Sequence, residues 1–233
     1  MQTHKRHHST HEFICERFGS PEAAEKYAAA QVGTAMHRRE VRCIKRVLGD
    51  LPAGAAVLDL PCGTGRLLPA LLRRGYRVTE ADSSPHMVEK AKETLARIGG
   101  REEQVRYIVA DALSTGLPDR SFDAVICNRL LHHFPDSQTR RRVLAELARV
   151  ARGRIVVSFF CSAAWDSAVF FARNALRRVH PDDRVPISYS TMSADARAVG
   201  LRVARVAAVR PGISKQWYLG LEHAEAMTML KAG

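Results

Sequence analysis

The stretch VLDLPCGTGRLL, residues 57–68, joins a short apolar strand to a glycine-rich turn. The strand runs into Asp59, and Gly63 and Gly65 follow with one residue between them. Glycines at such a turn let a ligand approach the backbone closely, as in nucleotide-binding α/β proteins. Leu68 stands where a dinucleotide-binding loop has its third glycine, which disfavours a dehydrogenase. No GK[ST] follows, which excludes a phosphate-loop NTPase.

Strand and helix patterns alternate on both sides of this turn, from residue 55 to residue 160. Alternation at this spacing predicts a parallel sheet covered by helices on both faces. Residues 21–49 favour one or two earlier helices, with Pro21 suited to a first turn and Gly49 to a stop. The expected strands are residues 55–60, 76–82, 105–111, 122–128, 154–160, 201–209 and 214–222, and the expected helices between them are residues 65–74, 84–98 and 136–151.

We therefore expect a Rossmann-like α/β fold: a doubly wound, mostly parallel, seven-stranded sheet with a C-terminal antiparallel strand pair. Residues 1–50 form a tail and helical cap, and residues 51–233 form the main domain. A lid-like insertion near residues 162–190 reads as an amphipathic helix, with Trp165 and Phe170 among its apolar residues. It either packs on the core, covers the substrate or binds a surface.

Three segments then resemble the successive motifs of class I S-adenosylmethionine-dependent methyltransferases, most closely the ubiquinone- and menaquinone-biosynthesis-like branch. The resemblance covers about residues 55–160, and its motifs fall in order at the ends of four strands. The segments are VLDLPCGTGRL (57–67), VTEADSSPHMVEKA (78–91) and VADALSTGLPDRSFDAVICNRLLHHFPD (109–136).

The resemblance implies S-adenosylmethionine as the cofactor. It implies that Asp82 accepts hydrogen bonds from the ribose hydroxyls and that Asp111 accepts one from the adenine amino group. Glu80 stands where the family usually has glycine, so it competes with Asp82 for the ribose. Arg129, at a position that is often small in relatives, could place a cation in the substrate cleft. The implied cofactor contacts are Asp59, Cys62, Gly63, Thr64, Gly65, Asp82, Ser83, Met87, Asp111, Ala112 and Asn128.

Two adjacent histidines, His132 and His133, are the candidate catalytic residues. Methyl transfer needs positioning and the exclusion of water, and it needs a base only where the nucleophile carries a proton of high pKa. Histidine suits proton removal near neutral pH, and we favour His133 facing the cleft. In the alternative reading, one imidazole only packs against the cofactor or caps the helix that begins near Asp136.

The net charge of +12 rests on 29 arginines and 7 lysines, and it fits either an acidic partner or a compositional bias. Five cysteines without a CxxC pair favour a reduced, cytoplasmic setting. No apolar run approaches a membrane span, and no signal-peptide core opens the chain. The N-terminal histidines His4, His7, His8 and His11 read as a solvated tail, so we expect no metal site.

These observations predict methyl transfer to a small, apolar acceptor: a quinone or lipid precursor or a secondary metabolite. An RNA or protein methyltransferase is the first alternative, which the basic charge permits. Against RNA, NRLL (128–131) stands where base-amino methylation uses [ND]PP[YF]. A non-catalytic partner subunit is the second alternative, against which the intact glycine turn and Asp82 argue. Peripheral membrane contact and the oligomeric state are left open.

Overall fold

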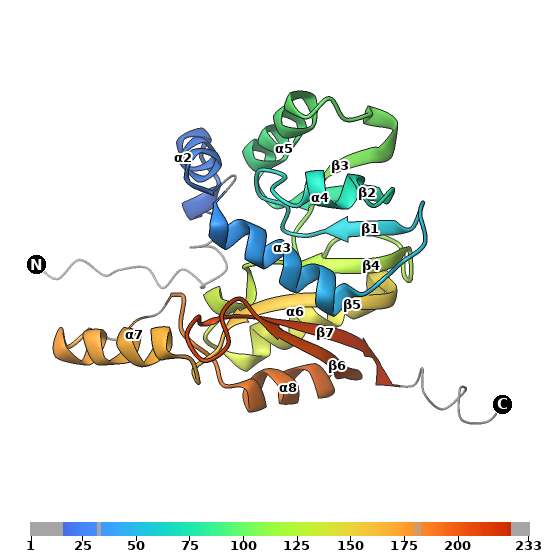
Figure 1. The fold of residues 1–233 in the computed structure, drawn as a ribbon. Coiled ribbons are helices and arrows are strands. Elements are labelled where there is room, and N and C mark those ends of the chain that lie inside the picture. The colour runs from blue at the N-terminus through green and yellow to red at the C-terminus, as the bar shows by residue number, and fades with distance from the viewer. Residues whose placement is uncertain (1–15, 32–33, 180, 182, 225–233) are drawn as a thin grey trace, which may run out of the picture.

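A computed structural model of the 233-residue chain describes residues 16–31, 34–179, 181 and 183–224. Its centre is a seven-stranded sheet in the order β3-β2-β1-β4-β5-β7-β6 (Figure 1). β7 runs antiparallel to β5 and β6, and the other neighbouring strands pair in parallel. The predicted fold class is therefore confirmed, including the C-terminal antiparallel pair. The strands are β1 (Ala56–Asp59), β2 (Arg77–Asp82), β3 (Val105–Val109), β4 (Phe122–Cys127), β5 (Ala151–Phe160), β6 (Leu201–Ala208) and β7 (Gln216–His223).

Helices cover both faces of this sheet because neighbouring residues of each central strand point to opposite sides. In β1, Val57 joins an apolar cluster with residues of α3 and α4, whereas Leu58 joins a second cluster with residues of α6. All three elements bury apolar residues at helical spacing. The helices are α2 (Pro21–Gln31), α3 (Ala35–Leu48), α4 (Leu68–Leu72), α5 (Pro85–Arg97), α6 (Ser137–Val150), α7 (Trp165–Leu176) and α8 (Tyr189–Arg197), with short 3-10 turns η1 (Glu102–Gln104) and η2 (Leu131–His133).

Local signals at the helix ends behave as the sequence predicts. Gly49 caps α3 with a positive φ of 69°, and Ser84 caps α5 directly before Pro85. The helix expected over residues 65–74 is the exception, since α4 spans only Leu68–Leu72. Residues 61–67 continue the turn instead, because Gly65 holds a left-handed φ of 71° that a helix cannot contain.

A buried ion pair fixes α8 against α6 and shapes the loop that follows η2. The Arg140 Nε donates to Asp195 at 2.8 Å, and its Nη1 donates to the carbonyls of Phe134 and Pro135, each at 2.8 Å. Both charged side chains are about 1% exposed. The guanidinium thus anchors the backbone directly after the histidine pair. Removing Asp195 would cost roughly 3–5 kcal/mol, because Arg140 would stay buried without a counter-ion, whereas Asp195 without Arg140 would keep its pair with Arg141 at 2.9 Å.

Residues 162–190 contain α7, which projects from the body at the end of β5 (Figure 1). Only Ser167 of this helix is buried. The interpretation that the helix packs on the core is therefore wrong, since most of its apolar side chains face outward. No helix in the described part of the chain is long and apolar enough to cross a membrane.

Candidate functional site

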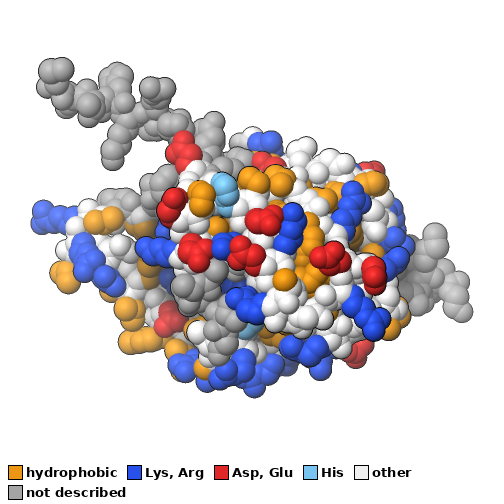
Figure 2. Space-filling view, turned by 90° about the horizontal axis from the view of Figure 1, so that it is seen from above, with side chains coloured by type: hydrophobic (Ala, Val, Ile, Leu, Met, Phe, Trp, Pro, Cys, Tyr) orange, Lys and Arg blue, Asp and Glu red, His pale blue; other side chains and the backbone are white. Residues whose placement is uncertain are grey.

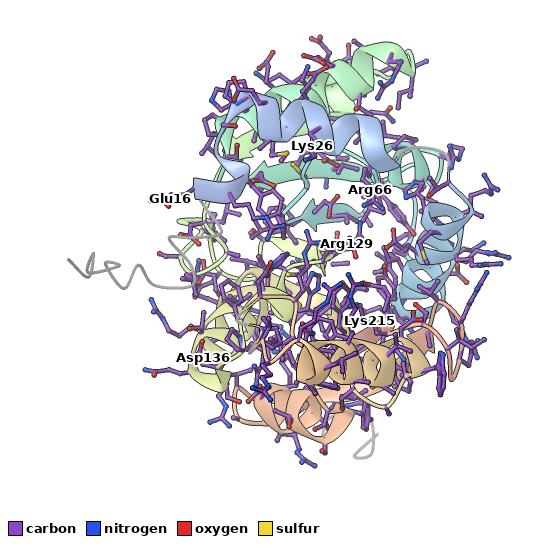
Figure 3. The ribbon with its side chains drawn as sticks, turned by 90° about the vertical axis from the view of Figure 1, so that its left-hand side faces the viewer. Glu16, Lys26, Arg66, Arg129, Asp136 and Lys215 are labelled. Carbon is purple, nitrogen blue, oxygen red and sulfur yellow. The ribbon has the colours of Figure 1, made fainter. Side chains whose placement is uncertain are left out.

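A cavity opens where β1, β2 and β4 end, at the edge predicted to bind ligand. It holds about 990 Å³ of free space, counting its open mouth. Figure 3 looks onto this end of the molecule, with Arg66 and Arg129 near its centre and Lys215 beside α7. The cavity is lined by Phe18, Asp59, Pro61, Cys62, Gly63, Arg66, Leu67, Asp82, Ser83, Met87, Asn128, Arg129, Leu130, His132, His133, Phe160 and Arg184.

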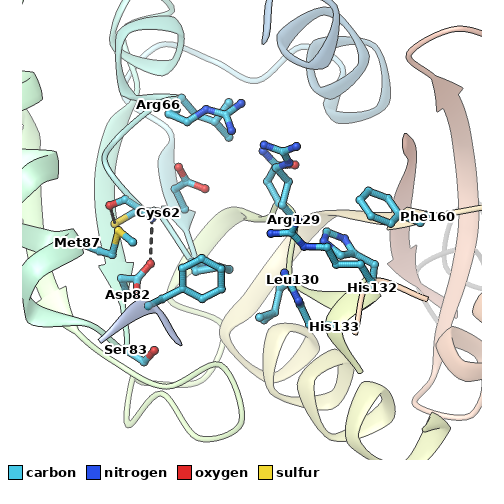
Figure 4. Close-up of a pocket in the computed structure, with 17 residues that line it drawn as sticks. Cys62, Arg66, Asp82, Ser83, Met87, Arg129, Leu130, His132, His133 and Phe160 are labelled. Carbon is cyan, nitrogen blue, oxygen red and sulfur yellow. Dashed lines mark hydrogen bonds between the residues drawn. The ribbon is translucent and has the colours of Figure 1, made fainter. Parts of the chain in front are cut away.

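The cavity has two facing walls. Figure 4 shows Asp82, Ser83 and Met87 on one side, and Phe160, His132 and His133 on the opposite side. The first wall is built from the glycine turn and the end of β2. The second is built from η2, the end of β5 and segments that lie far away in the sequence.

The glycine turn is fixed by backbone geometry. Gly63 and Gly65 have φ values of 54° and 71°, which side chains rarely tolerate. A Cβ on Gly65 would meet the Ala91 backbone of α5 at 3.1 Å, so this helix packs tightly against the turn. Thr64 is buried and its carbonyl accepts from the Thr94 hydroxyl at 2.9 Å, so Thr64 and Gly65 shape the turn without lining the cavity.

Asp82 ties the end of β2 to this turn. Its carboxylate accepts hydrogen bonds from the Gly63 amide at 2.9 Å and the Ser84 amide at 3.0 Å. Burial raises the pKa of Asp82 to about 6, and backbone hydrogen bonds from Ser84, Gly63 and Ser83 oppose this rise. Two carboxylates were candidates for the ribose contact, and of these Asp82 lines the cavity whereas Glu80 does not.

Asp59 and Glu80 are direct neighbours in the register of β1 and β2. Both carboxyls are buried, and burial raises the pKa of each well above its ordinary value. Their mutual repulsion adds to the rise for Glu80, whereas the cation of Arg66 opposes it for Asp59. Asp59 Oδ1 has no hydrogen-bond partner among the described residues. The cavity floor therefore offers a buried carboxyl oxygen that can accept from a bound donor.

The side chains of Arg66 and Arg129 lie beside the buried acid Glu40. Glu40 of α3 accepts from Arg66 at 2.5 Å, and the Arg129 Nε lies 3.6 Å from its other oxygen. Arg129 holds a left-handed φ of 64°, and its amide donates to Ser158 Oγ at 2.7 Å. The expected cation at Arg129 is thus in the cavity, whereas Arg66 and Glu40 were not anticipated.

The remaining implied cofactor contacts fall into two groups. Asn128 lines the cavity, and its Oδ1 accepts from Ser158 at 3.1 Å and Tyr218 at 3.2 Å. Asp111 and Ala112 lie after β3, outside the cavity lining, and Asp111 accepts from the Leu113 amide at 2.8 Å. The roles assigned to these residues in cofactor binding stay predictions.

His133 is held by residues that lie far from it in the sequence. Its Nδ1 hydrogen bonds to Asp183, whose other oxygen pairs with Arg17 at 2.5 Å. Phe18 meets the imidazole edge-on, with the ring centroids 5.9 Å apart. Burial raises the pKa of Asp183, but the hydrogen bond to His133 and the neighbouring Arg17 and Arg184 outweigh it, so the net shift is downward. This carboxylate stays ionised and fixes the imidazole.

His132 has different surroundings from its neighbour. Its ring stacks on Phe160 with a centroid distance of 3.8 Å and an interplanar angle of 6°. Burial, His133 and the cations Arg129, Arg184 and Lys215 hold its pKa well below the ordinary value. The side chain is therefore neutral and serves as an apolar wall beside Phe160.

Sequence reasoning found most of the first wall and little of the second. It named His133 but not Asp183, Phe18 or Phe160, because no local pattern marks a residue that reaches the site through tertiary contact. Among the described residues, no group of three His, Cys, Asp or Glu side chains could hold a metal ion. His4, His7, His8 and His11 lie outside the described residues.

Comparisons with known proteins agree with this geometry. Residues 57–153 match the family model described as a methyltransferase domain. A ubiquinone biosynthesis O-methyltransferase of Xanthomonas axonopodis pv. citri is 35% identical over 102 residues, which is 42% of this chain and 40% of that protein. An uncharacterized methyltransferase of Mycobacterium tuberculosis is 34% identical over 110 residues, 47% of this chain and 53% of that protein. The chain thus spans about half or less of the length of these curated relatives.

Solved structures share the fold over most of the chain. Magnesium protoporphyrin IX methyltransferase from Synechocystis PCC 6803, with bound SAH, superimposes with a TM-score of 0.74. The pair is 20% identical and covers 91% of this chain and 99% of that one. The mitomycin 7-O-methyltransferase structure gives a TM-score of 0.70 at 22% identity, covering 91% of this chain and 60% of that one.

Residues 57–153 thus match a methyltransferase domain, as the strand-end motifs predicted, and most of the chain shares the fold of solved methyltransferases. The match covers the first wall and also η2 with His132 and His133, and it ends before Phe160 and Asp183.

Proposed function

We propose that this protein transfers a methyl group from S-adenosylmethionine to a hydroxyl of a small, largely apolar acceptor. The observation that carries the proposal is the arrangement of the cavity. A glycine turn and a buried carboxylate form one wall, and a histidine held by a carboxylate faces them across the cavity. The names of relatives that methylate oxygen in quinone biosynthesis support the same reading.

The residues of the first wall fit the polar groups of S-adenosylmethionine. Asp82 would accept from the ribose hydroxyls, since its carboxylate lines the cavity and each oxygen can accept more than one hydrogen bond. The unpartnered Oδ1 of Asp59 would accept from the ammonium of the amino-acid tail. Arg66 and Arg129 would face the carboxylate of that tail. Met87 and Ser83, which line the same wall, would lie against the adenosine.

S-adenosylmethionine supplies, when bound, a methyl group that its sulfonium already activates for in-line displacement. The protein therefore has to orient the acceptor, exclude water and take up one proton. Nδ1 of His133 donates to Asp183, which leaves Nε2 as the ring nitrogen that can accept the proton of an acceptor hydroxyl. Asp183 fixes this tautomer and stabilises the imidazolium that forms, so it is a positioning residue.

The second wall favours an apolar acceptor. Phe160, Leu130, Phe18 and the neutral His132 supply aromatic and aliphatic surface around His133. A flat ring that carries a hydroxyl would pack against Phe160 and His132 while its oxygen faces His133. This surface supports a phenolic or quinol-like acceptor, whose ring can pack against the aromatic side chains.

Calorimetric titration tests the proposal directly. We expect S-adenosylmethionine and its demethylated product to bind with dissociation constants on the order of micromolar, a common level for small-molecule sites. Methyl-labelled cofactor should then pass label to members of a panel of hydroxylated aromatic compounds. Binding of NAD without binding of S-adenosylmethionine would overturn the assignment. Cofactor binding together with labelled RNA in a salt-sensitive reaction would replace the small acceptor by RNA.

A further inference from the structure

The helix α7 is held at its base and extends away from the body. The Trp165 amide donates to Gly212 at 2.9 Å, and the Asp166 amide donates to Ile213 at 3.0 Å. The buried Ser167 hydroxyl donates to the Cys161 carbonyl at 2.6 Å. Beyond this base the helix projects past the sheet, at the left of Figure 1. Its orientation relative to the domain is therefore set by its first turn.

One side of α7 faces the body, and it is the less apolar side. Ser167, Phe170 and Asn174 are its least exposed residues, and the Lys215 ammonium lies 4.8 Å from the Phe170 ring centroid. At about 100° per residue these three positions share one side of the helix, within roughly 60° of one another. The body thus takes up a narrow strip of the helix.

The opposite side of α7 is apolar and exposed. Trp165, Val169 and Leu176 are 67%, 48% and 87% exposed. They fall within roughly 40° of one another on the helix, and Ala172 lies beside them. A helix at the surface of a soluble protein normally packs its apolar face against the core. The apolar face of α7 is exposed instead, which is typical of a surface that binds a partner or a membrane. Figure 2 shows hydrophobic and basic side chains together at this projecting end.

Arginines lie beside one edge of this apolar face and at the end of the helix. Arg173 is about 40° from Val169 around the helix axis, Arg177 and Arg178 follow the last turn, and Asp166 is the one acid within the helix. Apolar residues flanked by cations are complementary to a bilayer with anionic headgroups, because the former enter the acyl boundary while the latter meet phosphates. A second copy of the chain fits less well, since a two-fold contact would bring the same arginines together.

We propose that α7 docks this protein onto an anionic lipid bilayer, with Trp165, Val169 and Leu176 inserted at the boundary between headgroups and acyl chains. The inference concerns the surface of α7 and holds whether or not the cavity transfers methyl groups. Because β5 ends beside the cavity, docking would bring the cavity mouth near the bilayer, where apolar molecules partition.

Vesicle co-sedimentation of the full chain tests the proposal. We expect binding to vesicles of equal parts phosphatidylglycerol and phosphatidylcholine, and much weaker binding to phosphatidylcholine alone. The variant Arg173→Gln/Arg177→Gln/Arg178→Gln should bind anionic vesicles roughly 100-fold more weakly, from the contribution of each arginine near a charged surface. The variant Trp165→Ser/Leu176→Ser should lose binding. These side chains are exposed, so the thermal melting of both variants should match the wild type.

Matched controls place equal changes elsewhere on the surface. Arg97→Gln/Arg101→Gln/Arg106→Gln removes three exposed arginines, and Ile98→Ser/Val206→Ser removes two exposed apolar side chains, none of them on α7. Both controls should bind like the wild type. In a Trp217→Phe background, Trp165 is the sole tryptophan, and its emission should shift to shorter wavelength with anionic vesicles.

Four results would overturn the proposal. The first is wild-type protein that binds neither kind of vesicle, and the second is Trp165 emission that vesicles leave unchanged. The third is a dimer that Trp165→Ser/Leu176→Ser dissociates while vesicle binding is absent, which would assign the face to a second copy. Equal loss in the arginine control would show that net charge alone, and not α7, drives any binding.

Discussion

The two walls of the cavity are built in different ways. The first takes its residues from Asp59 to Met87, so one unit of β1, α4 and β2, together with the start of α5, holds them. The second joins Phe18, His133, Phe160 and Asp183, which lie far apart in the sequence. The first wall is thus a local structure, whereas the second exists only after the chain has folded.

This difference explains where relatives match. The methyltransferase model covers residues 57–153, which contain the first wall and His133 but not its partner Asp183. A cofactor shared by many enzymes requires one fixed wall, whereas each acceptor requires its own. We infer that the specificity of this protein resides in the second wall and that the two walls can be disabled separately.

The largest expected effect is on turnover, from the second wall. His133→Ala should lower kcat by roughly 10²- to 10⁴-fold, the range for loss of a general base, with cofactor affinity unchanged. Steady-state kinetics with labelled cofactor and calorimetric titration measure the two quantities. The control His132→Phe keeps an aromatic ring against Phe160 and should retain most of the turnover.

The same kinetic and calorimetric measurements can contradict the separation of the two walls. A parallel loss of cofactor affinity in His133→Ala would make the histidine a packing residue shared by both walls. If His132→Phe is the damaging change, the wrong neighbour has been chosen as base. Asp183→Asn sharpens the assignment, because a positioning residue should lower kcat less than His133→Ala does and alter its pH profile.

The fold and the first wall could be predicted because their signals are short-ranged. Strand runs, the Ser84–Pro85 helix start and the glycine turn each lie within a few residues of sequence. Asp82 is distinguished from Glu80 only by the structure, since both lie on the same face of one buried strand and only Asp82, at the end of that strand, lines the cavity. Asp183, Phe18 and Glu40 gave no signal, because each depends on contacts made across many residues.

The next effect is on cofactor affinity, from the first wall. Asp82→Ala should weaken binding of S-adenosylmethionine by roughly 10- to 100-fold, because it removes a charged acceptor for two hydroxyl donors. Glu80→Gln is the matched control, and it should leave affinity near the wild type because Glu80 does not line the cavity. Calorimetric titration of both variants measures their dissociation constants for S-adenosylmethionine. A larger loss in Glu80→Gln would transfer the ribose contact to that residue.

The smallest effect is the pH dependence of cofactor binding. Burial raises the pKa of Asp82 to about 6, and hydroxyl donors bind the ionised carboxylate more strongly than the protonated one. Affinity should therefore be full well above this pKa and decline as the pH falls through it. Between about pH 7.5 and about pH 5.5, a single group with this pKa gives a loss of about fourfold.

Titrations at several pH values locate the responsible group. In Asp82→Asn the affinity should be lower at every pH, and its decline between these two pH values should disappear because the amide does not titrate. Glu80→Gln should keep the wild-type slope if the proton enters at Asp82. A slope that survives in Asp82→Asn and vanishes in Glu80→Gln would place the titration on Glu80. The buried carboxyl behind the wall, and not the one that lines it, would then couple the cofactor to pH.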